Sequence, residues 1–556
     1  MANCGSAAKD IREASDIRAF RFSSDRIGDQ DGVVCFVSNG GWLDGNSTAG
    51  FRKTIETEFA KIYVFNLRGN ARTVGDLNRR EGEPIFGATK FGGGSKTPIA
   101  IVLLVKRARH KGKAEILYRD IGDYLKRKDK LATIEQVGSF LSPEMNLVHL
   151  EPNEYGDWIT TRNPLFQTFI PLASEKKFDE ATKSAFVVHS RGMATAKDAW
   201  LYNFSRGAVL QNMQSMLDYY NSQLNAAEID YDSTKIGWSG GMLNDRASGR
   251  HIAFQKDQVS LALYRPFQKQ WLYHGERVIE RRYRFDNIFP TADAENRVLC
   301  VSGLGGNKDH SCLITDRITD LNCLDAGTQC FPLYWYEEAS AEGPLLNANE
   351  SSNGFVRRDG VSDYIHEEAR KKYGGGVTKE DIFYYVYGIL HHPKYRETFA
   401  DDLKKALPRV PMVESADDFR AFSKAGRALA DLHLDYEAVH PLPEVKVSEN
   451  LTNLRVDKMQ FLSKDQKHTI RYNGAVTVSN IPSKAYEYVV NGKSAIEWVM
   501  ERYQVKTDKD SEIVNDPNLY AVETGAANYI LNLLLSVIAV SVKTVEIVKA
   551  LPDTHW

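Results

Sequence analysis

The sequence predicts an α/β fold in which part of a Rossmann-like, doubly wound sheet precedes a large mixed α+β region. Three apolar runs, at residues 33–37, 61–67 and 98–105, have the length and composition of buried strands. A helical pattern over residues 48–59 joins the first run to the second, as in half of a doubly wound sheet. Beyond residue 158, short apolar runs mix with aromatic residues and later with helical patterns, which indicates an α+β region.

Each element near the N-terminus has its own signal. Apolar residues recur at helical spacing between residues 11 and 27, and a turn at residues 28–32 separates them from the first strand. The run from Val33 to Val37 is uninterrupted, so we expect this strand to be buried on both faces. The glycine-rich loop at residues 38–46 then follows the carboxyl end of the strand, where sheets of this type bind ligands.

The remaining elements are expected from shorter patterns. Residues 106–155 are rich in lysine and arginine and are interpreted as a basic connecting stretch. Thr378 and Asp381 resemble a capping box that opens a helix. Strands are expected at residues 296–302 and 311–315, and further helices at 199–225, 395–407, 495–503 and 520–551.

The composition is that of an ordinary globular chain and excludes several classes of protein. The 556 residues correspond to about three to four domains. No stretch has the roughly 18 uninterrupted apolar residues of a membrane span, and residues 529–542 are interpreted as a buried helix. The N-terminal residues lack the apolar segment of a secretory signal. Six cysteines without a CxxC pair exclude a disulfide scaffold and a zinc ribbon, so we expect a cytoplasmic protein. Cys300, Cys312, Cys323 and Cys330 are expected to be buried, and with no membrane span we expect no membrane partner.

Net charge is unevenly distributed along the chain. The total is −2, but residues 1–150 hold 24 basic and 18 acidic residues, a net charge of +6. Residues 151–330 carry a net charge of −2 and residues 331–556 one of −6. A polyanion-binding protein can have a neutral total when its basic residues gather on one face, so the distribution is compatible with a nucleic-acid partner.

Several motifs resemble enzyme signatures without meeting their requirements. The string GGGSKT at residues 92–97 has serine where a phosphate loop needs glycine, and a strand instead of a helix follows it. The glycines of residues 303–306 resemble a dinucleotide turn, but a strand follows them too, so we predict a hairpin turn. Asp435 with Glu444 and Lys446 matches a metal-dependent nuclease only loosely, because prolines separate the parts. No catalytic, cofactor-binding or metal-ligating residue is assigned.

Basic and aromatic residues provide the candidate DNA contacts. Arginine reads base edges and binds phosphates, and aromatic rings stack on bases. The densest cluster lies at residues 277–284, where ion pairing with Glu276 and Glu280 is the competing explanation. For the basic stretch after residue 105 the competing explanation is a solvated linker. The candidates are Lys106, Arg107, Arg109, Arg191, Arg277, Arg281, Arg282, Tyr283, Arg284, Lys308 and His310.

Several collinear segments resemble one family of enzymes. They are residues 17–27, 37–45, 64–70, 98–106, 329–336, 381–387 and 407–411. These segments resemble the adenine-N6 DNA methyltransferase and target-recognition portions of type ISP single-polypeptide restriction–modification enzymes. The resemblance extends from about residue 17 to residue 550 and implies a longer enzyme that also has nuclease and helicase-like ATPase parts.

The resemblance implies site-specific adenine methylation, with S-adenosylmethionine as the methyl donor of the full-length enzyme. Such enzymes flip the target adenine out of the duplex and hold it against an Asn-Pro-Pro-Tyr or Asn-Pro-Pro-Phe motif. This sequence lacks the motif, and its nearest string, at residues 163–166, has no second proline. Only 32 residues precede the first strand, and they contain no glycine-rich cofactor loop. We therefore expect an incomplete enzyme that by itself binds no cofactor and transfers no methyl group.

The expected organisation has four parts. Residues 1–115 are the C-terminal portion of the methyltransferase domain, 116–157 a basic connector, 158–336 the mixed α/β part of the target-recognition domain, and 337–556 its helical and C-terminal part. The expected partners are double-stranded DNA and the missing N-terminal methyltransferase, ATPase and nuclease parts. A free-standing, non-catalytic DNA-recognition module that acts with a separate methyltransferase or nuclease is the alternative. The resemblance places one loop at the edge of the active-site cleft, namely Ser38, Asn39, Gly40, Gly41 and Trp42.

Overall fold

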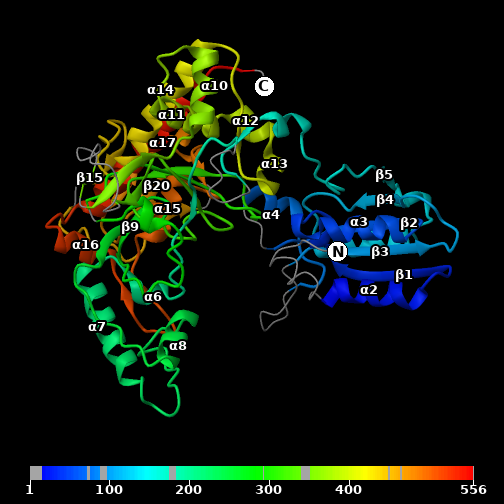
Figure 1. Ribbon diagram of the computed structural model, residues 1–556, viewed down its shortest axis with the longest axis horizontal. Helices are drawn as coiled ribbons and strands as arrows, with labels where there is room; N and C mark the ends of the chain where they lie inside the picture. The colour runs from blue at the N-terminus through cyan, green and yellow to red at the C-terminus, as the bar shows by residue number, and fades with distance from the viewer. Residues whose placement is uncertain are drawn as a thin grey trace. The chain divides into compact units, whose positions relative to one another are not determined.

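A computed structural model describes residues 15–71, 75–87, 97–174, 183–291, 293–339, 351–352, 354–448, 451–463, 466–554 and 556. The chain divides into unit 1, Met1–Pro164, and unit 2, Leu165–Trp556. Each unit combines helices with sheets (Figure 1). The glycine-rich string at residues 92–97 lies outside the described residues except for its last member.

Unit 1 contains a five-stranded sheet in the order β1-β3-β2-β4-β5. β3 pairs antiparallel with β1 on one side and with β2 on the other, β2 pairs parallel with β4, and β5 is antiparallel to β4. The elements are α2 (Ser15–Ile27), β1 (Gly32–Asn39), η1 (Gly40–Leu43), η2 (Asn46–Thr48), α3 (Ala49–Glu58), β2 (Lys61–Arg68), α4 (Gly75–Glu81), β3 (Ile99–Lys106), β4 (Glu115–Asp120), α5 (Arg127–Val137), η3 (Pro143–Met145) and β5 (Val148–Leu150).

The strand–helix–strand prediction is confirmed for β1, α3 and β2, but the sheet is mixed instead of parallel. Because β1 and β2 both run antiparallel to β3, they point in the same direction with β3 between them. A strand buried on both faces has the same apolar sequence in either direction, so the apolar runs carry no information on this point. The outcome is a mixed α/β sheet.

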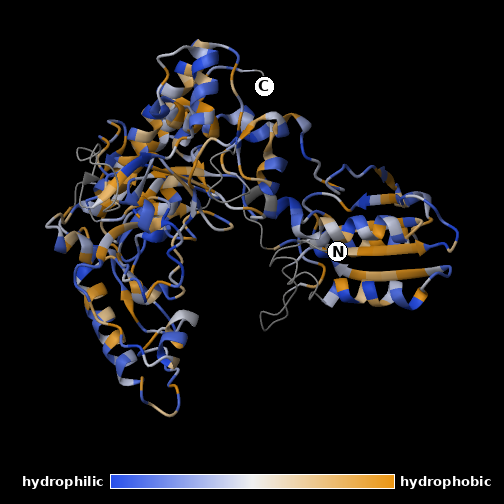
Figure 2. Ribbon diagram, viewed as in Figure 1, coloured by the Kyte–Doolittle hydropathy of each residue, from blue (hydrophilic) through white to orange (hydrophobic). Residues whose placement is uncertain are grey.

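β1 lies at the edge of the sheet, so the expectation that it is buried on both faces is wrong. Val33 and Val37 are 62% and 59% exposed, whereas Val34 and Ser38 are buried. The covered face packs against α2, whose Phe20 ring lies 5.0 Å from that of Phe36. Figure 2 shows β1 and β3 hydrophobic along their length, while α2 alternates between hydrophilic and hydrophobic residues.

The stretch expected as a basic connector contributes regular structure to unit 1. β4 pairs with β2 from Lys61↔Glu115 to Asn66↔Asp120, and β5 pairs with β4. Lys130 of α5 is fully buried, and its ammonium donates to the carbonyl oxygens of Leu67 and Glu81, each at 2.8 Å. The many lysines and arginines of this stretch hide its strands, because the apolar face of a half-buried strand needs only every second residue.

Unit 2 is a mixed α+β assembly, as predicted for the larger part of the chain. Its principal sheets have the orders β8-β10-β9, β12-β11-β13-β7, β14-β16-β15 and β18-β21-β20-β19. The strands are β6 (Ile170–Pro171), β7 (Ser190–Arg191), β8 (Tyr202–Asn203), β9 (Val259–Arg265), β10 (Gln268–Tyr273), β11 (Val298–Val301), β12 (Cys312–Thr315), β13 (Gln329–Pro332), β14 (Tyr334–Glu338), β15 (Ser351–Ser352), β16 (Phe355–Asp359), β17 (Arg409–Val410), β18 (Lys446–Val447), β19 (Gln460–Ser463), β20 (Gln466–Arg471), β21 (Thr477–Ser479), β22 (Val489–Val490), β23 (Lys493–Ser494), β24 (Lys506–Thr507) and β25 (Val514–Asn515).

Each helix that the sequence predicts in unit 2 is present with shifts at its ends, and the helices Gly240–Ala247, Asp363–Tyr373 and Ala416–Leu434 are additional. The predicted capping box is confirmed: the Thr378 hydroxyl accepts from the backbone N–H of Asp381, and the Asp381 carboxylate accepts from that of Thr378. The expected helix at 199–225 is interrupted by β8, and that at 520–551 breaks near Gly525, which has a φ of +70°. The helices are η4 (Pro164–Thr168, which spans the unit boundary), α6 (Asp198–Leu201), α7 (Arg206–Ser222), α8 (Gly240–Ala247), α9 (Phe285–Ile288), α10 (Asp363–Tyr373), α11 (Lys379–His391), α12 (Pro393–Thr398), α13 (Ala400–Lys405), α14 (Ala416–Leu434), η6 (Ser483–Tyr486), α15 (Ala495–Arg502), α16 (Pro517–Glu523) and α17 (Tyr529–Lys549).

Two glycines let α11 and α14 approach each other closely. A Cβ atom at Gly426 would lie 1.9 Å from the carbonyl oxygen of Tyr384, and one at Gly388 would lie 2.5 Å from that of Phe422. Every residue of α11 from Ile382 onward is buried. The pair therefore forms the centre of the helical part of unit 2.

α17 is a core helix, as the sequence predicts. Among the described residues it alone has the length and hydropathy of a membrane-crossing helix, and 72% of its most apolar window is buried in the protein. The Ser536 hydroxyl donates to the carbonyl oxygen of Tyr436 at 2.8 Å, which satisfies a polar group inside the core.

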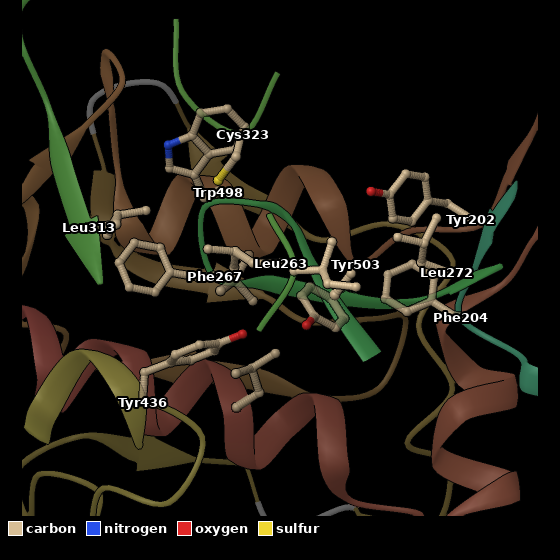
Figure 3. Close-up of a cluster of buried hydrophobic side chains, with 14 of the residues drawn as sticks. Tyr202, Phe204, Leu263, Phe267, Leu272, Leu313, Cys323, Tyr436, Trp498 and Tyr503 are labelled. Carbon is tan, nitrogen blue, oxygen red and sulfur yellow. The ribbon is translucent and has the colours of Figure 1, made fainter. Parts of the chain in front are cut away.

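The largest core cluster of unit 2 draws on elements from both ends of its sequence. Figure 3 shows Tyr202 and Phe204 beside Leu272, with Trp498 and Tyr503 contributed by the C-terminal region. The cysteines expected as buried hydrophobes are buried, namely Cys300, Cys312, Cys323 and Cys330. The described residues contain no group of three or more histidine, cysteine or acidic side chains that could hold a metal ion.

Candidate nucleic-acid interface

The structure brings together two arginine-containing segments that are far apart in the sequence. Arg191 lies in β7, and its guanidinium carbon is 5.9 Å from the centre of the Tyr283 ring. The backbones of Ala194 and Arg281 exchange hydrogen bonds of 2.9 and 3.0 Å, and the N–H of Arg284 donates to the Ser190 hydroxyl at 3.1 Å. We call Arg191, Arg281, Tyr283 and Arg284 the arginine–tyrosine cluster.

The members of the arginine–tyrosine cluster differ in exposure. Arg191 and Arg281 are exposed, and no acidic side chain of the described residues lies within ion-pair distance of the Arg281 guanidinium. Tyr283 is 41% exposed and has a φ of +51°, a conformation that costs a non-glycine residue about 1 kcal/mol or more. Arg284 is half-buried, and burial lowers the pKa of its guanidinium. Exposed guanidinium groups beside an exposed ring can bind phosphates and stack on a base.

Arg282 and Arg277 are engaged in contacts within the protein. Arg282 binds the Asp286 carboxylate through Nε at 2.9 Å and also donates to the carbonyl oxygen of His274. Arg277 lies 3.6 Å from the Asp245 carboxylate. The pairing expected as the competing explanation is therefore present, although with Asp286 and Asp245 in place of Glu276 and Glu280.

The turn between β11 and β12 is a hairpin, as predicted. The two residues predicted there to contact DNA, Lys308 and His310, are not both accessible, however. His310 is 7% exposed, neither ring nitrogen has a hydrogen-bond partner among the described residues, and burial lowers its pKa to about 3. A buried, neutral imidazole is unsuited to a phosphate contact, so the structure contradicts that expectation for His310. Lys308 is half-buried beside Asp325, and burial lowers its pKa.

The candidates of unit 1 lie at the end of β3 and just beyond it. The Lys106 ammonium lies 5.8 Å from the centre of the Phe59 ring, and Arg107 pairs with Asp31 at 2.9 Å. Arg109 is exposed, and no ion pair of its guanidinium occurs among the described residues. Arg109 is therefore the member of this group that is available to a ligand.

The loop after β1 is held rigidly by its own polar groups. The Asn39 side chain accepts from the backbone N–H of Gly41 at 2.8 Å, and the Trp42 indole donates to the Ser38 hydroxyl at 3.2 Å. Gly40 is buried, and its N–H donates to the carbonyl oxygen of Pro98 at 2.7 Å. Only Asn39 and Gly41 are exposed, since Trp42 is 4% exposed and packs in the core of unit 1.

A buried arginine fixes the far side of this loop. Arg52 of α3 is fully buried and donates to the carbonyl oxygens of Trp42 at 2.7 Å, Gly45 at 2.9 Å and Gly156 at 2.7 Å. Burial lowers the pKa of Arg52, and nearby acidic groups oppose that effect. Arg52 could not be identified from the sequence, because its partners are backbone carbonyls that no sequence pattern marks.

Unit 2 also contains a polar cavity of about 250 Å³ that the sequence does not predict. Tyr202 of β8, Gln268 of β10 and Arg502 of α15 line it and come from three distant parts of the sequence. Each is an ordinary residue of its own element, so no local signal could have identified the cavity.

Part of unit 2 matches the model of a known protein family. The model of the Type ISP C-terminal specificity domain matches residues 184–533. A comparison with curated proteins gives no match.

Three solved structures, two of them of Type ISP restriction–modification enzymes, are similar over nearly the whole chain. A nuclease-deletion mutant of LlaGI in complex with a DNA substrate mimic has 36% sequence identity and a TM-score of 0.84, and the match covers 97% of this chain and 48% of that one. DNA-bound LlaBIII has 35% identity and a TM-score of 0.87, with 97% and 34% of the two chains covered. The DrdV–DNA complex has 27% identity and a TM-score of 0.81, with 97% and 52% covered.

The chain thus spans between a third and about half of the length of these enzymes. The specificity-domain match lies wholly within unit 2 and includes the arginine–tyrosine cluster. With that match and the 36% identity to LlaGI, the chain belongs to the Type ISP family of restriction–modification enzymes, whose C-terminal specificity domain it contains.

Proposed function

We propose that this chain recognises a DNA target sequence within a Type ISP restriction–modification enzyme, by binding double-stranded DNA through unit 2. The observation that carries the proposal is the specificity-domain match over residues 184–533. LlaGI was solved with a DNA substrate mimic, and LlaBIII and DrdV with DNA, which supports the same partner for this chain. The N-terminal methyltransferase, ATPase and nuclease parts of such a system are the other proposed partners.

The arginine–tyrosine cluster supplies groups suited to this role. Arg191 and Arg281 can bind phosphates or base edges, and the Tyr283 ring offers a face for stacking. Phosphate contacts release counterions, so binding is expected to weaken steeply as salt rises. Base contacts from the same domain provide the sequence preference.

Unit 1 is proposed to be the C-terminal portion of an adenine-N6 methyltransferase domain. Its β1–α3–β2 arrangement, with a glycine-rich loop at the carboxyl end of β1, supports this assignment. Ser38, Asn39, Gly40, Gly41 and Trp42 are proposed to edge the active-site cleft of the whole enzyme.

The residues of this loop do not fit S-adenosylmethionine. The polar side chains of Ser38 and Asn39 are used in hydrogen bonds within the loop, and Trp42 is buried. The sequence also has no Asn-Pro-Pro-Tyr motif. We therefore assign the cofactor to the full-length enzyme and no methyl transfer to these 556 residues by themselves.

The proposed function is tested by electrophoretic mobility shift of the 556-residue chain with random-sequence duplex DNA at several salt concentrations. We expect binding at low salt that declines linearly in log–log form as salt rises. Absence of a shift at low salt would contradict DNA recognition. Incubation with tritiated S-adenosylmethionine and duplex DNA tests the second statement, and incorporation of label into adenine would contradict it.

A further inference from the structure

A polar cavity in unit 2 is walled by a sheet, a helix end and a hairpin. Its volume is about 250 Å³, below the roughly 300–1,000 Å³ of pockets for drug-sized ligands, so it suits a small molecule or a single group. The β24–β25 hairpin forms one wall and is anchored to β8: Asn203 donates to the carbonyl oxygen of Val514 at 3.0 Å, and the N–H of Phe204 donates to the Asn515 side chain at 3.0 Å. The cavity is therefore built into the fold.

Three buried polar atoms around this cavity have no hydrogen-bond partner among the described residues. They are the hydroxyl oxygen of Tyr202, the side-chain oxygen of Gln268 and Nε of Arg502. Tyr202 and Gln268 are each 2% exposed. A buried polar group without a partner is destabilising, so three around one space indicate a ligand that completes them.

The hydrogen bonds that these three atoms can donate or accept indicate which ligand fits the cavity. Nε of Arg502 donates, the Gln268 oxygen accepts, and the Tyr202 hydroxyl can do either. The Gln268 amide is oriented by its other atom, which donates to the carbonyl oxygen of Arg502 at 3.5 Å. A bare anion offers only acceptors and would leave Gln268 unsatisfied. The polar edge of a nucleobase carries a donor next to an acceptor and satisfies all three groups.

The cavity also has aromatic walls and a lysine, Lys506, which suit the base and the phosphate of a nucleotide. Tyr202 and Tyr264 lie with their ring centres 4.4 Å apart, and Phe204 also lines the cavity. Figure 3 shows the Tyr202 hydroxyl pointing away from Phe204 and Leu272. Lys506 lines the cavity, and no carboxylate of the described residues lies within ion-pair distance of its ammonium. A planar base beside these rings, with its phosphate on Lys506, uses every feature named.

The carboxylates at the cavity are already occupied. Asp198 accepts from the Tyr264 hydroxyl at 3.0 Å and from Arg265 at 3.3 Å, and Asp508 accepts from the N–H and hydroxyl of Ser511, each at 2.9 Å. Asp198 is thus paired with a cation, and Asp508 is held by hydrogen bonds within the protein, so Lys506 remains for a ligand phosphate.

One wall residue of the cavity is close in sequence to a residue that pairs with the arginine–tyrosine cluster. Asp198, in its wall, lies four residues beyond Ala194, whose backbone pairs with Arg281. We propose that this cavity binds a single unstacked nucleotide, with Gln268, Arg502 and Tyr202 contacting the base edge and Lys506 the phosphate. The assignment of that nucleotide to bound DNA rests on the proposed function, whereas a free nucleotide presents the same chemistry.

The first experiment measures binding of the four deoxynucleosides and their 5′-monophosphates to the full chain by isothermal titration calorimetry. We expect saturable binding of at least one base, tighter as the monophosphate. Tyr202→Phe and Gln268→Met should each weaken it by about three- to tenfold, the loss of one hydrogen bond. Lys506→Met should weaken the monophosphate and leave the nucleoside unchanged.

The second experiment places 2-aminopurine at each position in turn of a duplex selected for binding from a random-sequence pool. A fluorescence rise at one position, lost in Gln268→Met while the duplex still binds, assigns the cavity to a base of DNA. Nucleotide binding without such a rise assigns it to a free nucleotide. Neither nucleotide binding nor a rise means that only ordered water fills the cavity, and this outcome overturns the inference.

A matched variant separates this role from a structural one. Tyr436 also has a buried hydroxyl without a partner but does not line the cavity. Tyr436→Phe should leave nucleotide binding unchanged, and neither Tyr→Phe variant should lower the melting temperature, since each removes an unsatisfied group. A Tyr202→Phe protein that melts earlier and binds nucleotides normally would contradict the proposal. Failure of the chain to bind duplex DNA would contradict the proposed function, while the titration still decides the cavity.

Discussion

The guanidinium of Arg191 lies 5.9 Å from the centre of the Tyr283 ring, and both residues are exposed. The contact joins β7 to the segment before α9, and the Ala194–Arg281 backbone pairing holds the two segments in place. The cluster therefore rests on main-chain geometry, and its side chains can be changed without unfolding the domain.

Arg281→Ala should weaken duplex binding by about three- to tenfold and reduce the magnitude of the salt slope by about 1, because one phosphate contact is lost. The measurement is a mobility-shift titration at four salt concentrations. Arg420→Ala on α14 is the matched control, since Arg420 is likewise an exposed arginine, 65% exposed and paired with a neighbouring acid. Equal losses in both variants would remove the cluster from the interface.

Arg282→Ala should lower the free energy of unfolding by about 1–3 kcal/mol, because it leaves Asp286 and the carbonyl oxygen of His274 without their donor. Urea unfolding followed by circular dichroism measures the change. Arg281→Ala serves as the control and should unfold like the wild type. A stable Arg282→Ala protein with weakened DNA affinity would instead place Arg282 in the interface.

Gly426→Ala should destabilise unit 2 by about 3 kcal/mol or more, because the new methyl group would meet the carbonyl oxygen of Tyr384 at 1.9 Å and push α11 away from α14. Gly376→Ala is the control, since nothing lies within 4 Å of a Cβ there. Thermal unfolding compares the two proteins. Similar melting temperatures would show that the two helices can separate without cost.

Acid should destabilise unit 2 through buried neutral histidines. Burial lowers the pKa of His391 to about 4 and that of His310 to about 3, from an ordinary value of 6.5. The unfolded chain therefore takes up protons that the folded chain does not, so their contribution to stability is complete above pH 6.5 and is lost as pH falls toward 4. Each group contributes a slope of up to about 1.4 kcal/mol per pH unit.

Urea unfolding of His391→Gln at pH 7.5, 6 and 5 tests this expectation. The variant should lose less stability than the wild type between pH 6.5 and 5, although it starts lower because the hydrogen bond from the ring to the carbonyl oxygen of Tyr387 is changed. His251→Gln, at an exposed position, is the control and should follow the wild type. A wild-type slope in His391→Gln would show that other groups cause the acid sensitivity.

Much of the local structure could be predicted from the sequence, because its causes are local. The capping box at Thr378, the hairpin between β11 and β12, and the burial of α17 all follow from residue types at fixed spacing. The strands at residues 115–120 and 148–150 could not, because each is short and lies in a stretch whose lysines and arginines dominate its composition. The edge position of β1 was also beyond prediction, since a continuous apolar run has the same sequence at an edge as at the centre of a sheet.

In the candidate interface, too, some features could be predicted from the sequence and others could not. Arginine and tyrosine at residues 281–284 were identified by type, but their sequence does not say that Arg282 is held by Asp286 or that His310 is buried. Such facts depend on which distant groups come within a few ångströms after folding.

The sequence by itself determined the family, the mixed composition of the fold and most helix positions, because these depend on motifs and periodicities that neighbouring residues carry. Only the tertiary structure decided that Arg191 meets Tyr283, and that Tyr202, Gln268 and Arg502 converge on one cavity. Hydrogen bonding and charge act over a few ångströms of space, while the residues involved are separated by up to 300 positions in the chain. The fold alone brings them within that range.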